Sequence, residues 1–196
     1  MLSLVSGRSA IACLLALVVV ACTKEPAAPE QANAAAVSPD EAAPAGPAAK
    51  AGAVDRSHAG EAIPAARLTG MDGRPATLGS FRGKPVLVNL WATWCAPCIA
   101  ELPTLEKAAG SVTTVLLNQG EDAAKAQPFL ARAGVAKAQA LLDPDMAVSL
   151  ALPANLPTTL LYDAAGKEVW RVTGGRDWAS ADSRAIIAEA GSSQGT

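Results

Sequence analysis

The chain has 196 residues, of which 51% are hydrophobic and 17% charged, and its seven aromatic residues all lie between Phe81 and Trp178, so we expect one folded domain after an unfolded segment. Residues 63–191 number about 129, which is enough to bury a core without metals or structural disulfides and excludes a second domain. Lys and Arg balance Asp and Glu at 12 each over residues 63–196, so the basic surface that nucleic-acid binding needs is missing and we expect no nucleic-acid partner.

The first residues predict an export signal. Arg8 precedes an apolar run over residues 10–21, which is too short to span a membrane as a helix. The run ends in the letters VVAC at Cys22, which resembles the bacterial lipobox, where the signal is cut before a cysteine that is then acylated. This resemblance predicts a lipoprotein signal peptide over residues 1–21 and a lipid anchor on Cys22. An ordinary secretory signal with an incidental cysteine is the alternative.

Residues 22–62 are expected to form a disordered, lipid-anchored tether. Ala, Pro and Glu dominate this segment, and prolines interrupt each Ala-rich run before a stable helix can form. Thr23 stands where an Asp would favour retention at the inner membrane in enteric bacteria, so the lipobox resemblance favours the outer membrane, facing the periplasm. The only histidine, His58, is expected to be a solvated tether residue and not a ligand.

The hydrophobic pattern of the remaining chain predicts an α/β domain. A continuous apolar run over residues 85–92 predicts a buried strand that leads into an amphipathic helix over 98–109. Before these two we expect a small hairpin over 66–78. After them we expect, in chain order, a strand over 112–117, a helix over 123–133, a short strand or an extended link over 138–142, and a helix over 143–150. Strands over 158–162 and 168–173, joined as a hairpin, and a helix over 180–190 complete the domain. Parallel strands thus come first and an antiparallel pair last.

Two cysteines, Cys95 and Cys98, remain for the folded domain. Cys13 leaves with the signal, and Cys22 is expected to carry lipid. One closely spaced pair is no disulfide scaffold, and a structural zinc site needs four Cys or His ligands where this domain offers two cysteines and no histidine. The pair therefore predicts redox chemistry without a metal.

A resemblance to a known family is carried by two motifs, GKPVLVNLWATWCAPCIAELPTL and, about 60 residues after the cysteines, LPTTLLYDAAGK. Both resemble the TlpA/ResA-like branch of the thioredoxin superfamily, which consists of exported, membrane-tethered thiol-disulfide oxidoreductases. The resemblance spans about residues 63–190. It implies a thioredoxin-like fold over residues 63–191, with a mixed central sheet flanked by helices, the small hairpin as an N-terminal extension, and a disordered tail over 192–196.

The spacing of the cysteines suits a reversible disulfide. On a first helical turn, the Cα atoms of Cys95 and Cys98 would lie about 5 to 6 Å apart, which a disulfide can span without backbone movement. Amides and dipole at the helix start favour a thiolate at Cys95 and so stabilise the reduced form. Ala96 and Pro97 form the loop between the sulfurs, and Pro97 restrains it at little cost. Two buried, inert cysteines are the alternative.

The resemblance also implies the role of each side chain at the site. Cys95 is the attacking nucleophile and Cys98 the resolving thiol. Glu101, three residues later on the same helical face, is a partly buried carboxyl that tunes the pair and can shuttle its proton. A solvated acid that merely favours the helix dipole is the alternative for Glu101.

Further residues match the family at the edge of the site. Pro157 matches the cis-proline whose loop faces the disulfide and pairs with an extended substrate segment, with a trans turn proline as the alternative. Leu156 precedes it, Trp94 is expected to pack beside the site, and Trp91 is expected in the core. Asn89 stands six residues before the first cysteine, where general thioredoxins carry a buried aspartate and the TlpA/ResA-like branch commonly has asparagine.

These observations predict a protein disulfide reductase with no cofactor beyond the redox-active disulfide. The resemblance implies oxidised protein thiols of the periplasm as substrates, for which apocytochrome c and copper proteins are the candidate classes, and a membrane electron donor of the DsbD/CcdA type. We expect a monomer. A Cu(I) metallochaperone using the same two cysteines, a thiol peroxidase and a dimeric isomerase are the alternatives, and the motif leaves the direction of electron flow open.

Overall fold

The computed structural model describes residues 52–152 and 154–192. The predicted signal peptide, the lipid site at Cys22 and most of the predicted tether lie outside these residues, as does the predicted tail beyond residue 192. Within the described residues, no helix is long and apolar enough to cross a membrane.

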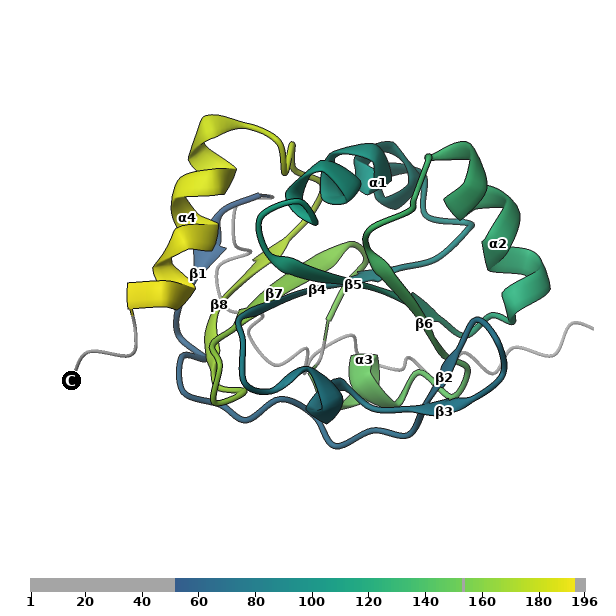
Figure 1. The fold of residues 1–196 in the computed structure, drawn as a ribbon, viewed down its shortest axis with the longest axis horizontal. Coiled ribbons are helices and arrows are strands. Elements are labelled where there is room, and N and C mark those ends of the chain that lie inside the picture. The colour runs from purple at the N-terminus through teal and green to yellow at the C-terminus, as the bar shows by residue number, and fades with distance from the viewer. Residues whose placement is uncertain (1–51, 153, 193–196) are drawn as a thin grey trace, which may run out of the picture. The chain divides into compact units, whose positions relative to one another are not determined.

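A mixed eight-stranded sheet forms the centre of the domain (Figure 1). Its strands run in the order β1-β8-β7-β4-β5-β6-β2-β3. β4, β5 and β6 are parallel to one another, while β7 and β8 are antiparallel to their neighbours, as the sequence predicts. The strands are β1 (Val54–Asp55), β2 (Leu68–Gly70), β3 (Pro75–Ala76), β4 (Val86–Trp91), β5 (Thr113–Gln119), β6 (Gln139–Asp143), β7 (Thr158–Tyr162) and β8 (Glu168–Thr173).

Helices cover both faces of the sheet, and β4 shows how its residues divide between them. Leu87 and Trp91 pack in the core under α1 (Ala96–Ala108), α2 (Ala123–Arg132) and α4 (Ala181–Ser192). Val88 and Leu90 point to the opposite face, where the 3-10 turn η1 (Leu78–Phe81) and α3 (Ala147–Ala151) lie. Figure 1 shows α1, α2 and α4 along one side of the sheet and α3 along the other. The predicted thioredoxin-like fold is therefore confirmed, and Trp91 is a core residue as expected.

One predicted helix begins later than expected. The sequence places its start at Asp143, whereas Asp143 ends β6 and α3 begins at Ala147. The carboxylate of Asp143 accepts hydrogen bonds from the backbone N–H groups of Ala147 and Val148 at 2.9 and 2.8 Å. Asp143 thus binds the start of the helix across a turn, and Met146 within that turn adopts a left-handed φ of 52°.

The predicted end of the tether at residue 62 is wrong, because residues 54–62 belong to the folded domain. Val54 and Asp55 pair with β8, and Ala62 forms a bridge to Lys167. A polar, Ala-rich segment can do this because an open sheet edge offers main-chain hydrogen bonds that need no apolar side chain. The sequence gives no warning of it, since the segment has the composition of a linker.

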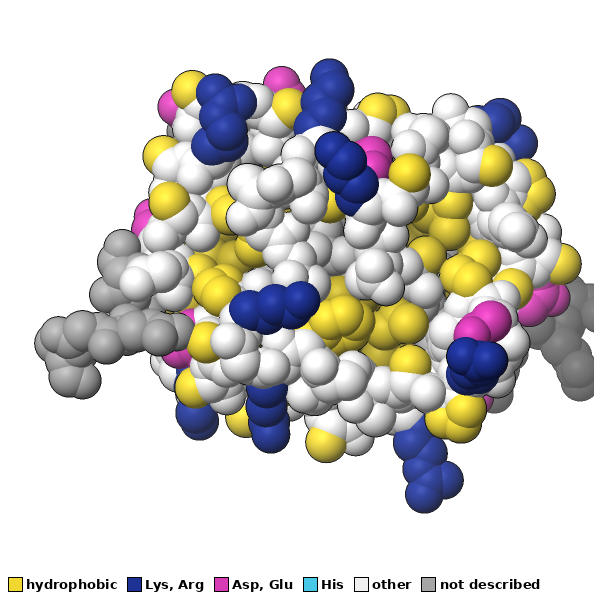
Figure 2. All heavy atoms as spheres, viewed as in Figure 1, with side chains coloured by type: hydrophobic (Ala, Val, Ile, Leu, Met, Phe, Trp, Pro, Cys, Tyr) yellow, Lys and Arg dark blue, Asp and Glu magenta, His cyan; other side chains and the backbone are white. Residues whose placement is uncertain are grey.

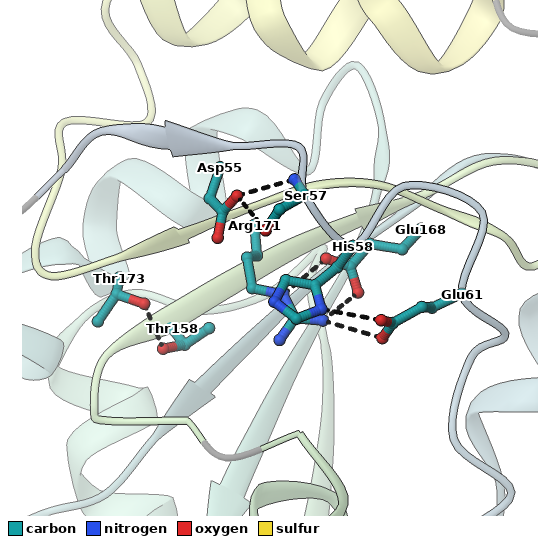
Figure 3. A network of polar contacts seen from close by, with 8 residues as sticks. All are labelled: Asp55, Ser57, His58, Glu61, Thr158, Glu168, Arg171 and Thr173. Carbon is teal, nitrogen blue, oxygen red and sulfur yellow. Dashed lines mark hydrogen bonds and ion pairs between the residues drawn. The ribbon is translucent and has the colours of Figure 1, made fainter. Parts of the chain in front are cut away.

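Side-chain ion pairs also hold residues 54–62 against β8 (Figure 3). The buried guanidinium of Arg171 donates to both carboxylate oxygens of Glu168 at 2.7 Å and lies 3.5 Å from an oxygen of Glu61. His58 contacts the other oxygen of Glu61 at 2.9 Å. His58 is therefore a surface residue of the domain and not a tether residue.

Charged side chains are spread out on the face seen in Figure 2. Lys and Arg side chains lie both at the rim and on this face, and apolar side chains show in the hollows of its surface. This face carries no continuous basic stripe of the kind that tracks a nucleic-acid backbone.

Candidate active site

Cys95 and Cys98 lie where β4 gives way to α1 and form a disulfide. Cys95 is the N-cap of α1, and its Sγ accepts the backbone N–H of Cys98 at 3.3 Å. Their Cα atoms are 5.3 Å apart, within the predicted range. The helix N-terminus therefore points a backbone donor at the sulfur that the sequence assigns as nucleophile, and this favours negative charge there.

The surroundings of the two sulfurs differ. Cys95 is 5% exposed and Cys98 is fully buried. Ala96 and Pro97 are exposed between them, and the side chain of Trp94 is 68% exposed. Only Cys95 can therefore be approached from solvent, past Trp94 and the Ala96-Pro97 loop. Trp94 directly precedes Cys95, and its exposed side chain extends into solvent.

The carboxyl group of Glu101 lies inside the domain, one helical turn after Cys98. Glu101 is only 3% exposed, so the alternative of a solvated helix-start acid is excluded. Its Oε1 accepts a hydrogen bond from Nδ2 of Asn89 at 2.7 Å. Its Oε2 accepts hydrogen bonds from the backbone N–H of Arg176 and from Nε1 of Trp178, both at 3.1 Å. All of these partners are donors, which suits the ionised form of the carboxyl.

Burial opposes these donors and dominates the pKa of Glu101. Removal of the carboxyl from water raises its pKa to about 7, although the hydrogen bonds from Arg176, Asn89 and Trp178 act to lower it. Near neutral pH Glu101 therefore exists in both protonation states. A group with such a pKa can accept a proton from a reacting thiol and return it.

Asn89 links Glu101 to the sheet. Its Nδ2 also donates to Oγ1 of Thr159 on β7 at 2.9 Å, so one amide group bridges α1 and β7 across β4. Its Oδ1 is buried, and no hydrogen-bond partner for this oxygen is found among the described residues. If Glu101 becomes protonated, its O–H needs an acceptor. Rotation of the Asn89 side-chain amide would present Oδ1 of Asn89 as that acceptor.

A second buried carboxylate holds the loop before Cys95. Glu121 is 6% exposed and accepts the backbone N–H and the hydroxyl of Thr93 at 2.8 and 2.6 Å. Asn118 donates to it at 2.9 Å, and Lys125 forms an ion pair with it at 2.9 Å. Burial alone would raise the pKa of Glu121, but these partners outweigh it and lower the pKa to about 2. Glu121 is therefore ionised at neutral pH and fixes the loop that carries Trp94 and the nucleophile.

The peptide bond between Leu156 and Pro157 is cis, as the family resemblance implies. Pro157 directly precedes β7, whose first residue, Thr158, pairs with Leu90 near the end of β4. Pro157 therefore lies at the same end of the sheet as the cysteines. Leu156 is partly buried and contacts the cores on both faces.

Three residues of the site are absent from the sequence prediction, namely Glu121, Arg176 and Trp178. Glu121 follows the buried strand next to β4, and an acidic residue at that sheet end is a signal that could have been used. Arg176 and Trp178 lie 75 and 77 residues after Glu101. No local pattern in the sequence connects them to it.

The described residues contain no cluster of three His, Cys, Asp or Glu side chains that could hold a metal ion. The redox-capable group in this part of the chain is the cysteine pair itself. A cysteine pair at a helix start in a thioredoxin-like sheet, beside a buried carboxyl, defines a thiol-disulfide oxidoreductase.

Comparisons with known proteins agree with this class. A family model described as Redoxin matches residues 58–186, more than half of the chain, so the chain belongs to the Redoxin family. Thiol-disulfide oxidoreductase ResA of Geobacillus thermodenitrificans is 31% identical over 120 residues, which cover 59% of this chain and 69% of the relative. Thiol:disulfide interchange protein DsbE of Yersinia pestis is 36% identical over 120 residues, covering 59% and 64%.

A solved structure supports the same assignment. A crystal structure from Chlorobium tepidum, described as a thiol:disulfide interchange protein DsbE, is 29% identical with a TM-score of 0.56, covering 67% of this chain and 96% of that chain. The resemblance to the TlpA/ResA-like branch is thereby confirmed.

Proposed function

We propose that this protein is an exported disulfide reductase that passes electrons from a membrane donor to oxidised protein thiols in the periplasm. The observation that carries the proposal is the Cys95–Cys98 pair at the start of α1, with Cys95 5% exposed and Cys98 fully buried. One helical turn later, the buried carboxyl of Glu101 has a pKa of about 7. The cysteine pair is the redox group, and no resident cofactor takes part.

The geometry supports a two-step exchange. In the reduced protein, the thiolate of Cys95 attacks one sulfur of a substrate disulfide, forms a mixed disulfide and displaces the other substrate sulfur as a thiolate. Cys98 then loses its proton to Glu101 and attacks Cys95, which restores the Cys95–Cys98 bond and releases the second substrate sulfur. Two electrons reach the substrate, and its thiolates take up two protons from solvent and from Glu101.

The loop at Pro157 supplies the place for the substrate chain. In our proposal an extended substrate segment pairs with the backbone beside the cis-proline, next to Leu156, while exposed Trp94 covers the segment from the other side. The cysteines of apocytochrome c and of copper proteins are the substrate classes that the family resemblance favours. A lipid anchor on Cys22, an outer-membrane location, a donor of the DsbD/CcdA type and a monomeric state complete the proposal.

Reduction potential and activity test the function directly. We expect the Cys95–Cys98 couple to equilibrate with glutathione at a potential of about −250 mV or below, among reductants, and the protein to reduce insulin disulfides. A potential near about −120 mV would make it an oxidant. Stoichiometric Cu(I) binding without insulin reduction, or rapid peroxide consumption, would replace the proposal with one of the alternative functions.

Trapping of partners tests the assignment of the two cysteines. Cys98→Ala should accumulate mixed disulfides through Cys95 in the periplasm, because the resolving thiol is missing. Cys95→Ala is the matched control and should trap nothing, since Cys98 is fully buried. Equal trapping by both variants would contradict the assignment of Cys95 as nucleophile.

A further inference from the structure

The side chain of Arg176 joins three separate parts of the domain. Its Nη1 donates to the backbone oxygen of Gly52 at 2.8 Å, and its Nε donates to the hydroxyl of Ser183 on α4 at 2.8 Å. The guanidinium also lies 5.9 Å from the ring centre of Trp178. Ser183 is fully buried, so this side of the link has a fixed position.

The other side of the link is fixed by the sheet. The backbone N–H of Gly52 donates to the oxygen of Thr173 at 2.8 Å, and β1 follows at once along the edge of β8. The ion pair between Glu61 and Arg171 of β8 holds the residues after β1 against the same strand (Figure 3). Arg176 therefore bonds to a carbonyl that cannot move without breaking the edge of the sheet.

The backbone of Arg176 belongs to the redox site. Its N–H donates to Oε2 of Glu101 at 3.1 Å. The neighbouring Gly175 comes so close to the active-site loop that a Cβ placed on it would lie 3.5 Å from Cβ of Pro97. A shallow pocket of about 350 Å³ lies between residues 175–177 and α1, and Glu101 and Arg176 both line it. A small movement of residues 174–178 would open the Glu101 carboxyl to water.

We propose that Arg176 is a positioning residue of the redox site: its guanidinium ties Gly52 of the N-terminal segment and Ser183 of α4 to the loop whose backbone N–H binds Glu101. The inference rests on the proposed function, since it assigns Glu101 a part in thiol-disulfide exchange. It gives Gly52, just before β1, a role in supporting the active site.

Loss of the guanidinium should change the titration of Glu101 in one direction. With the loop released, water would replace the Arg176 N–H as a donor and would also hydrate the carboxyl. Burial is the largest influence on this carboxyl, so hydration should win and the pKa of Glu101 should fall towards its usual value. Arg176 and Asp177 are the charged residues that line the pocket with Glu101, the cysteine pair lies one turn before it at the start of α1, and β4 contributes the uncharged Asn89.

The test uses the full chain in detergent and the pH dependence of its exchange rate with insulin disulfides. Wild type should show an inflection near pH 7, and Arg176→Ala should move it down by about one pH unit. Gly52→Pro should have a similar effect, because its φ of 80° and its N–H bond are both lost to proline. The inflection of the double variant should shift no further than that of either single variant, since both substitutions disrupt the same link between Arg176 and Gly52.

Arg56→Ala is the matched control. Arg56 fastens the same segment to Glu189 of α4 at 2.7 Å, on the exposed surface and without contact to Glu101. Arg56→Ala should leave the inflection at the wild-type pH. Arg176→Lys keeps a side-chain donor, so its inflection should lie between those of wild type and Arg176→Ala. The inference would be overturned if the inflection of Arg176→Ala lay at the same pH as that of wild type. It would also be overturned if Arg56→Ala shifted the inflection as far as Arg176→Ala does. An inactive wild type would instead overturn the proposed function.

Discussion

At the scale of single residues, Glu101 stands between two opposing effects. Its folded-state pKa of about 7 lies above the ordinary value of 4.5, so the folded protein binds this proton more tightly than the unfolded chain does. The linkage is therefore unfavourable at high pH: stability falls as pH rises from 4.5 to 7 and stays lower above 7. A shift of this size corresponds to about 3 kcal/mol. Such a cost is typical of a group retained for chemistry.

Glu101→Gln removes the titration and keeps the shape. We expect the inflection near pH 7 in the exchange rate to disappear and the rate at pH 7 to fall about 10- to 100-fold, because Cys98 loses its proton acceptor. The free energy of unfolding at pH 8 should rise, since an uncharged amide replaces a buried charge. Rates measured from pH 5 to 9 and urea unfolding at pH 8 check both effects. Glu106→Gln on the same helix is the control and should keep the inflection.

Asn89→Leu should act on Glu101 in the opposite direction from Arg176→Ala. The leucine fills the same space but removes the donor to Oε1 of Glu101 without admitting water. The pKa of Glu101 should therefore rise, and the rate inflection should move above pH 7 by about one unit. Thr159 also loses its partner, so we expect a loss of about 1 to 2 kcal/mol in unfolding free energy. An inflection below pH 7 in this variant would show that Asn89 does not control the carboxyl.

At the scale of elements, the turn between β4 and α1 depends on the turn after β5. Glu121 receives two hydrogen bonds from Thr93, so the loop that presents the nucleophile is fixed from a neighbouring strand end. The folded-state pKa of Glu121 is about 2, below its ordinary 4.5. This stabilisation is complete above pH 4.5 and is lost as pH falls from 4.5 to 2.

Glu121→Gln should therefore lower stability most at neutral pH. We expect a loss of about 3 kcal/mol at pH 7, shrinking as pH falls to 3, because wild type loses the same contribution in acid. Urea unfolding at pH 7, 4 and 3 measures the difference. Asp122→Asn is the control: Asp122 caps α2 through the backbone of Lys125 and does not contact Thr93, so its effect should be small. A Glu121→Gln penalty that does not change with pH would contradict the linkage.

Helices and strands were predictable where the apolar residues of a segment follow a single strand or helix periodicity. The strand leading to Cys95 and the helix after it follow from their hydrophobic patterns, and Asn89 and Glu101 follow from their spacing to the cysteines within the family motif. The donors from Arg176 and Trp178 were not predictable, because they come from a loop after β8 that reaches Glu101 only through the tertiary fold. The late start of α3 depends on a side-chain cap across a turn, which periodicity does not detect.

At the scale of the whole molecule, the main surprise is where the domain begins. Residues 52–62 have the composition of a linker, yet Val54 and Asp55 pair with β8, Glu61 contacts the buried Arg171, and Gly52 accepts a hydrogen bond from Arg176 beside the redox site. Backbone pairing and ion pairs hold them, and neither leaves an apolar pattern in the sequence. A domain boundary taken from composition alone would therefore cut through the sheet.

Two truncated chains test this boundary. A chain starting at residue 63 should be less stable than one starting at residue 45 by about 2 kcal/mol or more, because it loses the backbone bonds of β1, the packing of Val54 and the cover over Arg171. Its exposed β8 edge should also promote self-association. Urea unfolding and sedimentation of both chains measure these effects, with the full chain as reference. Equal midpoints for the two truncated chains would mean that the pairing of residues 52–62 with β8 does not stabilise the domain.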